Sequence, residues 1–281
     1  MMTDHTSWLR PEDYLEPACP LCMDPPDAER AVDPVPQQRI VQKLDEYMSR
    51  RDYDGAERHL LYWLSEAERG NDLRGELLVR NELIGHYRKV GDRDNAFLHS
   101  ERALELLDTL ELAGSVSAGT TYVNAATAAS AFGEHERALS LFERAKTVYE
   151  AEQRTQKHLL GGLYNNMALC CQALGRYDEA FRLYEQAMDA MAEVAYGALE
   201  QAITCMNMAD AVALRDGMEA GEGQIFSLLD RAYDLLHTPG IPHEGYYAFV
   251  CEKCAPTFSY YGYFAAAAEL EQEAKAIYER A

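Results

Sequence analysis

Four glycines stand 42 residues apart in this chain of 281 residues: Gly91, Gly133, Gly175 and Gly217. One alanine follows each of the first three glycines by five residues, and a second follows by twelve. These alanines are Ala96, Ala138 and Ala180, and then Ala103, Ala145 and Ala187. Self-similarity at a fixed period of this length is the signature of a repeat protein. Any fold of the chain must therefore place these positions equivalently in successive units.

The repeating unit is predicted to be a pair of helices. Apolar positions recur at helical spacing in segments of about 15–20 residues, and no segment shows the sustained alternation of a strand. Glycine most easily ends a helix in a left-handed conformation, and a small alanine lets two helices approach closely. Because one pair cannot bury its apolar face alone, we expect about six pairs to stack into a continuous core.

The frame continues beyond the four glycines in both directions. It extends backward, at a spacing of 40, to Arg51, Ala56 and Trp63, and forward to Gly262, Ala267 and Ala274. We expect a longer loop around residues 216–223 to absorb the larger forward spacing.

Proline marks a boundary near the amino end. Seven of the 10 prolines lie in the first 36 residues, and none occurs from 37 to 238. We therefore predict a proline-rich, non-helical extension at 1–35 and a helical domain at 36–281. The extension carries too many apolar groups for a purely solvated tail, so we expect it to dock on the repeats. These groups are Trp8, Tyr14, Leu15, Leu21 and Met23.

Residues 164–187, YNNMALCCQALGRYDEAFRLYEQA, resemble the tetratricopeptide repeat (TPR) family. Residues 93–111 and 135–152 repeat the second-helix pattern, while 36–70 and 243–281 match in part. The resemblance spans about 240 residues and implies an all-α, right-handed α-solenoid of about six TPR-like helix pairs, with a period of 40–42. Since the family's common property is holding other proteins, it also implies a protein- or peptide-binding adaptor or scaffold.

The charge balance restricts the partners. The chain has 26 Lys and Arg against 47 Asp and Glu, a net charge of −21. This charge repels phosphate backbones and anionic lipids, so we expect no nucleic-acid or membrane partner and a neutral or basic protein segment instead. No apolar run long enough to span a bilayer and no secretory signal is found, and the seven cysteines are scattered, which predicts a cytoplasmic protein with reduced thiols.

Signatures of catalysis are missing from the sequence. It contains no phosphate loop, no dinucleotide glycine motif, no paired-histidine metal motif and no nucleophile elbow. Residues 92–95 superficially suggest a calcium loop, but the apolar residues that follow supply no ligands, so we interpret them as a helix start. We expect a protein that is not an enzyme and has no cofactor.

The main functional signal is a column of amides. Asn124, Asn166 and Asn207 each stand two residues before an alanine of a predicted first helix, spaced 42 and 41 apart. The family resemblance implies that this helix face lines a concave groove. Companion positions expected on or near the same face are Asn81, Glu82, Thr120, Thr127, Asn165 and Asp210.

Two interpretations of this column remain open. An asparagine amide both donates and accepts, so a ladder of amides suits the backbone of an extended peptide. Alternatively, the amides solvate an exposed face or bridge neighbouring first helices. A variant of the first interpretation is a peptide-sensing regulatory protein that acts by protein contact.

Two further clusters carry alternatives. Cys19 with Cys22, and Cys251 with Cys254, have the spacing of zinc half-sites, which makes a zinc-binding protein an alternative function. The second pair also falls at positions facing the helix interface, where cysteine acts as a small hydrophobe, and we expect the extension to dock without metal. Eight aromatic residues between 246 and 264 predict self-association or docking through residues 243–281.

Overall fold

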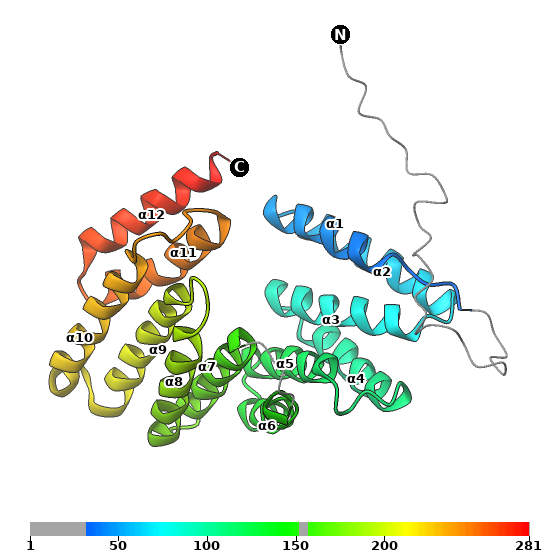
Figure 1. Cartoon of the computed structure of the whole chain (residues 1–281), viewed down its shortest axis with the longest axis horizontal. Coiled ribbons are helices and arrows are strands. Elements are labelled where there is room, and N and C mark those ends of the chain that lie inside the picture. The colour runs from blue at the N-terminus through cyan, green and yellow to red at the C-terminus, as the bar shows by residue number, and fades with distance from the viewer. Residues whose placement is uncertain (1–31, 152–156, 281) are drawn as a thin grey trace, which may run out of the picture. The chain divides into compact units, whose positions relative to one another are not determined.

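The computed structural model describes residues 32–151 and 157–280 (Figure 1). The described residues form twelve α-helices and no strand, so the predicted all-α solenoid of helix pairs is confirmed. The chain divides into two compact units, Met1–Ala113 and Gly114–Ala281, here called unit 1 and unit 2. Among the described helices, none combines the length and apolar character needed to cross a membrane.

Unit 1 contains two helix pairs. Its helices are α1 (Gln37–Ser49), α2 (Tyr53–Arg69), α3 (Leu73–Val90) and α4 (Arg93–Thr109). Helix α2 packs against both α1 and α3, and α4 packs against α3. The side chains of Asp52, Asp72 and Asp92 cap α2, α3 and α4 by accepting backbone N–H groups of the first turn. The Asp92 cap shows that residues 92–95 are a helix start, as the sequence predicts.

The described residues before α1 are non-helical and packed. The backbone N–H of Val35 donates to Oδ2 of Asp72 at 2.9 Å, and the backbone N–H of Asp33 donates to the carbonyl of Gly70. Val35 itself is buried. The last residues of the predicted extension therefore dock on the turn between α2 and α3. The part of the extension from 1 to 31, with Cys19, Cys22 and its apolar groups, lies outside the described residues.

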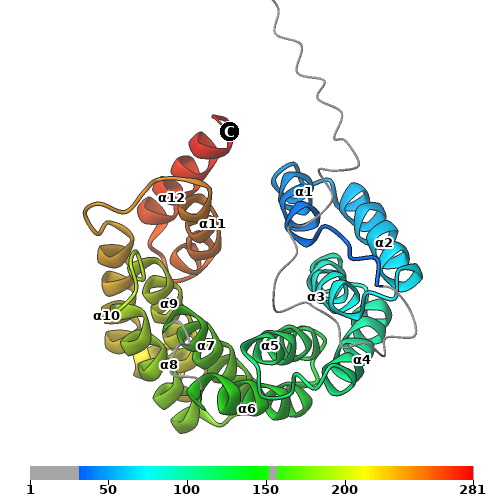
Figure 2. The same ribbon diagram turned by 45° about the vertical axis from the view of Figure 1, so that its right-hand side comes forward.

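Unit 2 contains four helix pairs. Its helices are α5 (Val116–Ala131), α6 (His135–Ala151), α7 (Lys157–Ala173), α8 (Tyr177–Ala192), α9 (Ala198–Asp216), α10 (Met218–Leu236), α11 (Gly245–Tyr260) and α12 (Phe264–Tyr278). The first helices also contact one another in the series α5, α7, α9 and α11. Figure 2 shows α5, α7 and α9 on the inner side of the curve of unit 2, with α6, α8 and α10 outside them.

The predicted register is confirmed at the ends of the first helices. Gly91, Gly133, Gly175, Gly217 and Gly262 all have positive φ angles, between 74° and 86°. Arg51 holds the equivalent position after α1, with φ 56°. In a residue with a Cβ atom this conformation strains the backbone, so glycine recurs at these positions.

The alanines of the register are buried. Those five residues after each glycine are fully buried: Ala96, Ala138 and Ala180. Those twelve residues after are also buried: Ala103, Ala145, Ala187 and Ala274. Ala56 and Ala267 extend the same pattern to the first and last pairs. Small buried side chains thus recur at one or both of these positions in every pair except α9/α10, where Glu222 and Leu229 stand five and twelve residues after Gly217.

One sequence expectation is wrong. Residues 216–223 do not form a long loop, because α10 begins at Met218, directly after Gly217. The additional residues extend α10 at its amino end, and Gly221 permits this extension. A Cβ atom at Gly221 would lie 2.7 Å from Cγ1 of Val212 on α9, so only glycine allows the two helices to pack here. The glycines of this segment indicated a loop, but they serve close packing.

Two glycines, one inside α3 and one directly after it, give a matched stability test. Gly85 lies inside α3 with open space where a Cβ would be, while Gly91 has equally open space but φ 80°. We expect Gly85→Ala to stabilise the protein by about 0.5–1 kcal/mol, since glycine is a poor helix former, and Gly91→Ala to destabilise it by about 1–2 kcal/mol through backbone strain. Urea denaturation followed by circular dichroism measures both. Equal effects would show that the left-handed conformation is not required.

Candidate functional site

Three first helices of unit 2, α5, α7 and α11, carry a stripe of solvent-accessible positions at equivalent places, whereas on α9 the equivalent Thr204 and Ala211 are buried. On α5 it consists of Ser117, Thr120, Asn124, Thr127 and Ala131, spaced alternately by three and four residues. The positions 42 residues later on α7 are Leu159, Gly162, Asn166, Leu169 and Ala173, and they are also accessible. Counted from the closing glycine, the stripe on α11 is Tyr246, Phe249, Lys253, Pro256 and Tyr260, all exposed. We call these stripes, with the accessible residues of α9, the first-helix face.

The amides of this face separate into two groups. Asn165 is buried, and its Oδ1 accepts hydrogen bonds from Nδ2 of Asn207 at 3.0 Å and from Oγ1 of Thr204 at 3.3 Å. Asn165 thus links α7 to α9. This contact is the bridge between neighbouring first helices that the sequence analysis left open as an alternative. The Asn207 side chain therefore has a structural role.

The register of the amide column needs correction at Asn207. Asn124 and Asn166 stand nine residues before their closing glycines, whereas Asn207 stands ten before Gly217, like Asn165 before Gly175. The equivalent of Asn166 on α9 is Met208. The spacing of 41, one short of the period, is the signal in the sequence that separates Asn207 from the other two.

Asn166 is the amide best placed to bind a ligand. It is half-buried on the accessible stripe of α7, and its side chain makes no hydrogen bond to any described residue. The neighbouring hydroxyls on α5 are engaged locally. Thr127 donates to the carbonyls of Val123 and Asn124, and Thr120 contacts the Tyr149 hydroxyl at 3.2 Å.

Charged residues are nearly absent from α5 and α7, the first two helices of this face. Helix α5 contains no Asp, Glu, Lys or Arg, and α7 contains only Lys157. Their accessible stripes offer hydroxyl, amide and small apolar groups. Helices α6 and α8, by contrast, carry charged residues along most of their exposed surface. A partner on α5 and α7 would therefore meet neutral polar groups.

The α9–α11 part of the face combines carboxyls with aromatic rings. Tyr261 donates to Oδ1 of Asp210 at 2.8 Å, and Tyr246 donates to Glu200. Desolvation raises the pKa of both carboxyls; the Lys253 charge opposes this for Glu200 and the Tyr261 hydrogen bond opposes it for Asp210. For both carboxyls, the raised pKa means that the cost of desolvating the charged form exceeds the stabilisation from its neighbours.

The predicted aromatic cluster divides between core and surface. Tyr247, Phe258 and Tyr261 are buried in the core of unit 2. The exposed rings are Tyr246, Phe249, Tyr260 and Phe264, the last two at 72% and 69% of their full exposure. Tyr263 is half-buried, and the helical period separates the buried rings from the exposed ones.

The cysteines of α11 belong to the core. Cys251 and Cys254 are buried, and desolvation raises the pKa of their thiols to about 11 and about 12. Both groups therefore stay protonated at neutral pH, as a small hydrophobe does. Among the described residues, no three His, Cys, Asp or Glu side chains are arranged to hold a metal ion.

The remaining predicted residues, Asn81 and Glu82, lie on α3 in unit 1. Nδ2 of Asn81 donates to the carbonyl of Leu77 at 3.0 Å, one turn earlier. Burial raises the pKa of the Glu82 carboxyl, and the Asp45 charge adds to the effect. Because these residues belong to the other unit, the candidate site is built from unit 2 alone.

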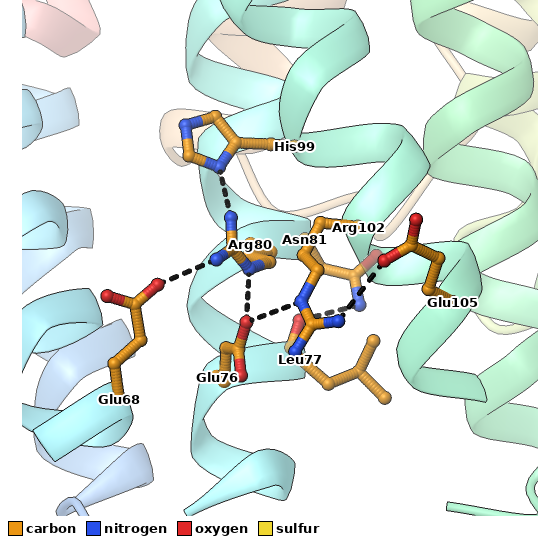
Figure 3. A network of polar contacts seen from close by, with 8 residues as sticks. All are labelled: Glu68, Glu76, Leu77, Arg80, Asn81, His99, Arg102 and Glu105. Carbon is orange, nitrogen blue, oxygen red and sulfur yellow. Dashed lines mark hydrogen bonds and ion pairs between the residues drawn. The ribbon is translucent and has the colours of Figure 1, made fainter. Parts of the chain in front are cut away.

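A buried ion network lies beside Asn81 (Figure 3). Glu76 accepts hydrogen bonds from Arg80 at 2.7 Å and from Arg102 at 3.0 Å, although it is only 3% exposed. Arg80 also donates to Glu68 and to Nδ1 of His99. The paired charges compensate one another, so the network holds α2, α3 and α4 together and leaves no charge free for a ligand.

Comparison with known proteins gives the family. Residues 76–151 and 159–218 match the sequence profile of the tetratricopeptide repeat. Together with the helix pairs and their register, this match identifies the chain as a tetratricopeptide repeat protein. No curated protein matches the sequence.

Two solved structures are similar in fold. TPR-like repeats of a protein described as a kinesin light chain from Podosopora anserina share 18% identity, cover 70% of this chain and 92% of their own, and have a TM-score of 0.50. BtubC (BKLC) from P. vanneervenii shares 16% identity, covers 86% of this chain and 89% of its own, and also has a TM-score of 0.50. At these identities the similarity concerns the fold.

Adjacent asparagines should differ in their effect on stability. We expect Asn165→Ala to destabilise the protein by about 1–2 kcal/mol, because the Asn207 amide loses its acceptor and the Thr204 hydroxyl keeps only the Glu200 carbonyl. Asn166→Ala should leave stability within about 0.5 kcal/mol of the wild type, since alanine is the better helix former. Thermal and urea denaturation measure both. A large loss on Asn166→Ala would assign that amide to the core as well.

Buried His99 predicts a pH effect on stability. Desolvation, followed by the Arg80 charge, lowers the pKa of His99 to about 4, and the unfolded chain keeps a value near 6.5. Between these values the unfolded state binds more protons, so stability is full above the unfolded value and falls as the pH drops toward 4. From pH 7 to pH 5 we expect the wild type to lose about 2 kcal/mol more than His99→Gln. Urea denaturation at both pH values measures this difference, and parallel losses would contradict it.

Proposed function

We propose that the first-helix face of unit 2 binds an extended segment of another protein, so that the chain acts as an adaptor or scaffold. The observation that carries this proposal is the matched accessible stripe on α5 and α7, with the unpaired amide of Asn166 at its centre. The proposal requires no catalytic group and no cofactor.

Neutral polar groups on α5 and α7 suit a peptide backbone. An amide can pair with both a backbone carbonyl and a backbone N–H without selecting a side chain. Because these two helices carry almost no charge, they impose no charge requirement on the segment. Gly162, beside Asn166 on the stripe, leaves open space in which a backbone can approach closely.

The α9–α11 part of the face favours a basic residue in the same segment. Glu200 and Asp210 supply carboxyls, and Tyr246, Phe249 and Tyr260 supply exposed rings. A cation beside a carboxylate and over a ring gains both electrostatic and cation–π energy. The partner is therefore a neutral to basic segment, in agreement with the acidic composition of the chain.

The bridging interpretation explains only part of the amide pattern. The bridge uses Asn165 and Asn207, which are drawn together by Thr204 and by each other. Asn166 takes no part in the bridge and remains accessible. A binding role is therefore proposed for Asn166 and its stripe, and a structural role is assigned to the bridge.

A pair of glycine variants tests the proposal. Gly162 on α7 and Gly223 on α10 both lie inside helices with open space around an added Cβ, so replacement by glutamine is tolerated at both. Peptides of random sequence are selected by display against the full chain, and their affinity is measured by calorimetry. We expect Gly162→Gln to weaken binding at least about tenfold, because its side chain fills the face, and Gly223→Gln to leave it unchanged.

Asn166→Ala provides a second, finer measurement on the same peptides. Loss of one amide-to-backbone hydrogen bond should weaken binding about two- to tenfold. If the selected peptides bind both glycine variants equally well, the first-helix face is not the site. If the selection enriches no peptide, the proposal fails.

A further inference from the structure

A groove lies on the second-helix side of unit 2, between α10 and α12. Its volume is about 600 Å³, and the turn residues Gly262 and Tyr263 are among those that line it. The side chains that line it are Asp230, Tyr233, Asp234, Tyr263, Phe264 and Glu269. They combine three carboxyls with three aromatic rings. None of these residues belongs to the first-helix face.

Hydrogen bonds hold two of the rings in place. The Tyr233 hydroxyl donates to Oε2 of Glu269, and the Tyr263 hydroxyl donates to Oδ1 of Asp230, each at 2.8 Å. Tyr263 also packs against Phe258, with ring centroids 5.8 Å apart. Each of these carboxylates keeps a second oxygen that its tyrosine does not use. The groove therefore has fixed ring walls and available acceptors.

Positive charge is missing from the lining of this groove. No Lys or Arg is among its lining residues. His237 stands beside the groove: its Nε2 lies 3.5 Å from Oε1 of Glu269, and it is charged only when protonated. Within the lining itself, three carboxyls face no Lys or Arg.

The equivalent position two repeats earlier provides an internal comparison. A groove of about 450 Å³ lies at the equivalent place between α6 and α8. Its acidic residues are accompanied by Lys146 and Arg182, and no aromatic residue lines it. The negative charge of the groove between α6 and α8 is thus balanced by cations within its own lining. In the groove between α10 and α12, aromatic rings stand in place of these cations.

We propose that the groove between α10 and α12 binds a cationic side chain, arginine or lysine, presented by a partner protein. A guanidinium or ammonium group pairs with Asp234 and with the oxygens of Asp230 and Glu269 that their tyrosines do not use, while its flat or methylene part lies on Tyr233, Tyr263 and Phe264. Because the lining carries carboxyls without Lys or Arg, the groove favours a cation. The aromatic rings favour a cation that is carried on a long, partly apolar side chain. This site is independent of the function proposed for the first-helix face.

The experiment uses the full-length chain labelled with ¹⁵N. It is titrated with the capped peptide acetyl-Gly-Arg-Gly-Arg-Gly-amide and with the same peptide containing citrulline, the neutral isostere of arginine. We expect the arginine peptide to shift the amide signals of Gly262, Ala265 and Ala266, and the citrulline peptide to leave them in place. Raising the salt concentration should weaken the arginine interaction.

Matched variants locate the binding. Asp234 and Phe264 are exposed, so the double substitution Asp234→Asn/Phe264→Ala leaves the core intact. We expect it to weaken binding of the arginine peptide at least about fivefold. Asp189→Asn, which removes the same charge from the groove between α6 and α8, should change the affinity by less than about 1.5-fold. Gly162→Gln should have no effect, which separates this site from the first-helix face.

Three results would overturn the proposal. Equal loss on Asp189→Asn would show attraction by net charge alone. Equal binding of the citrulline peptide would show that the positive charge is not recognised. Shifts confined to other helices, or to signals that also broaden with protein concentration alone, would place the contact elsewhere or indicate self-association.

Discussion

The close approach of paired helices at small side chains is the interaction on which the rest of the structure depends. The alanines five and twelve residues after Gly91, Gly133, Gly175 and Gly262 are buried among the packed helices. In α7 the same constraint is met by Gly161, where a Cβ would lie 2.7 Å from Cε of Met191. Larger residues at these positions would separate the helices, and the accessible stripes of successive first helices would lose their common alignment.

This constraint explains how much could be predicted from the sequence. Closing glycines and buried alanines recur in most pairs because these positions favour one backbone conformation or a small side chain, so the helix pairs and their register follow from spacing. The extension of α10 could not be predicted, because Gly221 suggests a loop until its contact with Val212 is known. A glycine kept for packing and a glycine kept for a turn look identical in one sequence.

The candidate site was only partly predictable for a related reason. A spacing identifies which helix face a residue occupies, but not whether its hydrogen-bonding groups are already used. Asn165 and Asn166 are neighbours with the same chemistry, yet one is buried in a bridge to Asn207 and the other is accessible. The groove between α10 and α12 depends on Asp230 and Glu269 from different helices, and no motif in the sequence brings them together.

The uneven charge of the first-helix face has a consequence for orientation. Helices α5 and α7 are almost free of charge, while α9 carries Glu200 and Asp210 and α11 carries exposed rings. A chain lying along these helices therefore meets chemically different ends. Reversing its amino-to-carboxyl direction would move a basic residue from the carboxylates to the neutral helices and forfeit its electrostatic gain. If a segment binds this face as proposed, the face would discriminate between a sequence and its reverse, even though the amide at its centre would not.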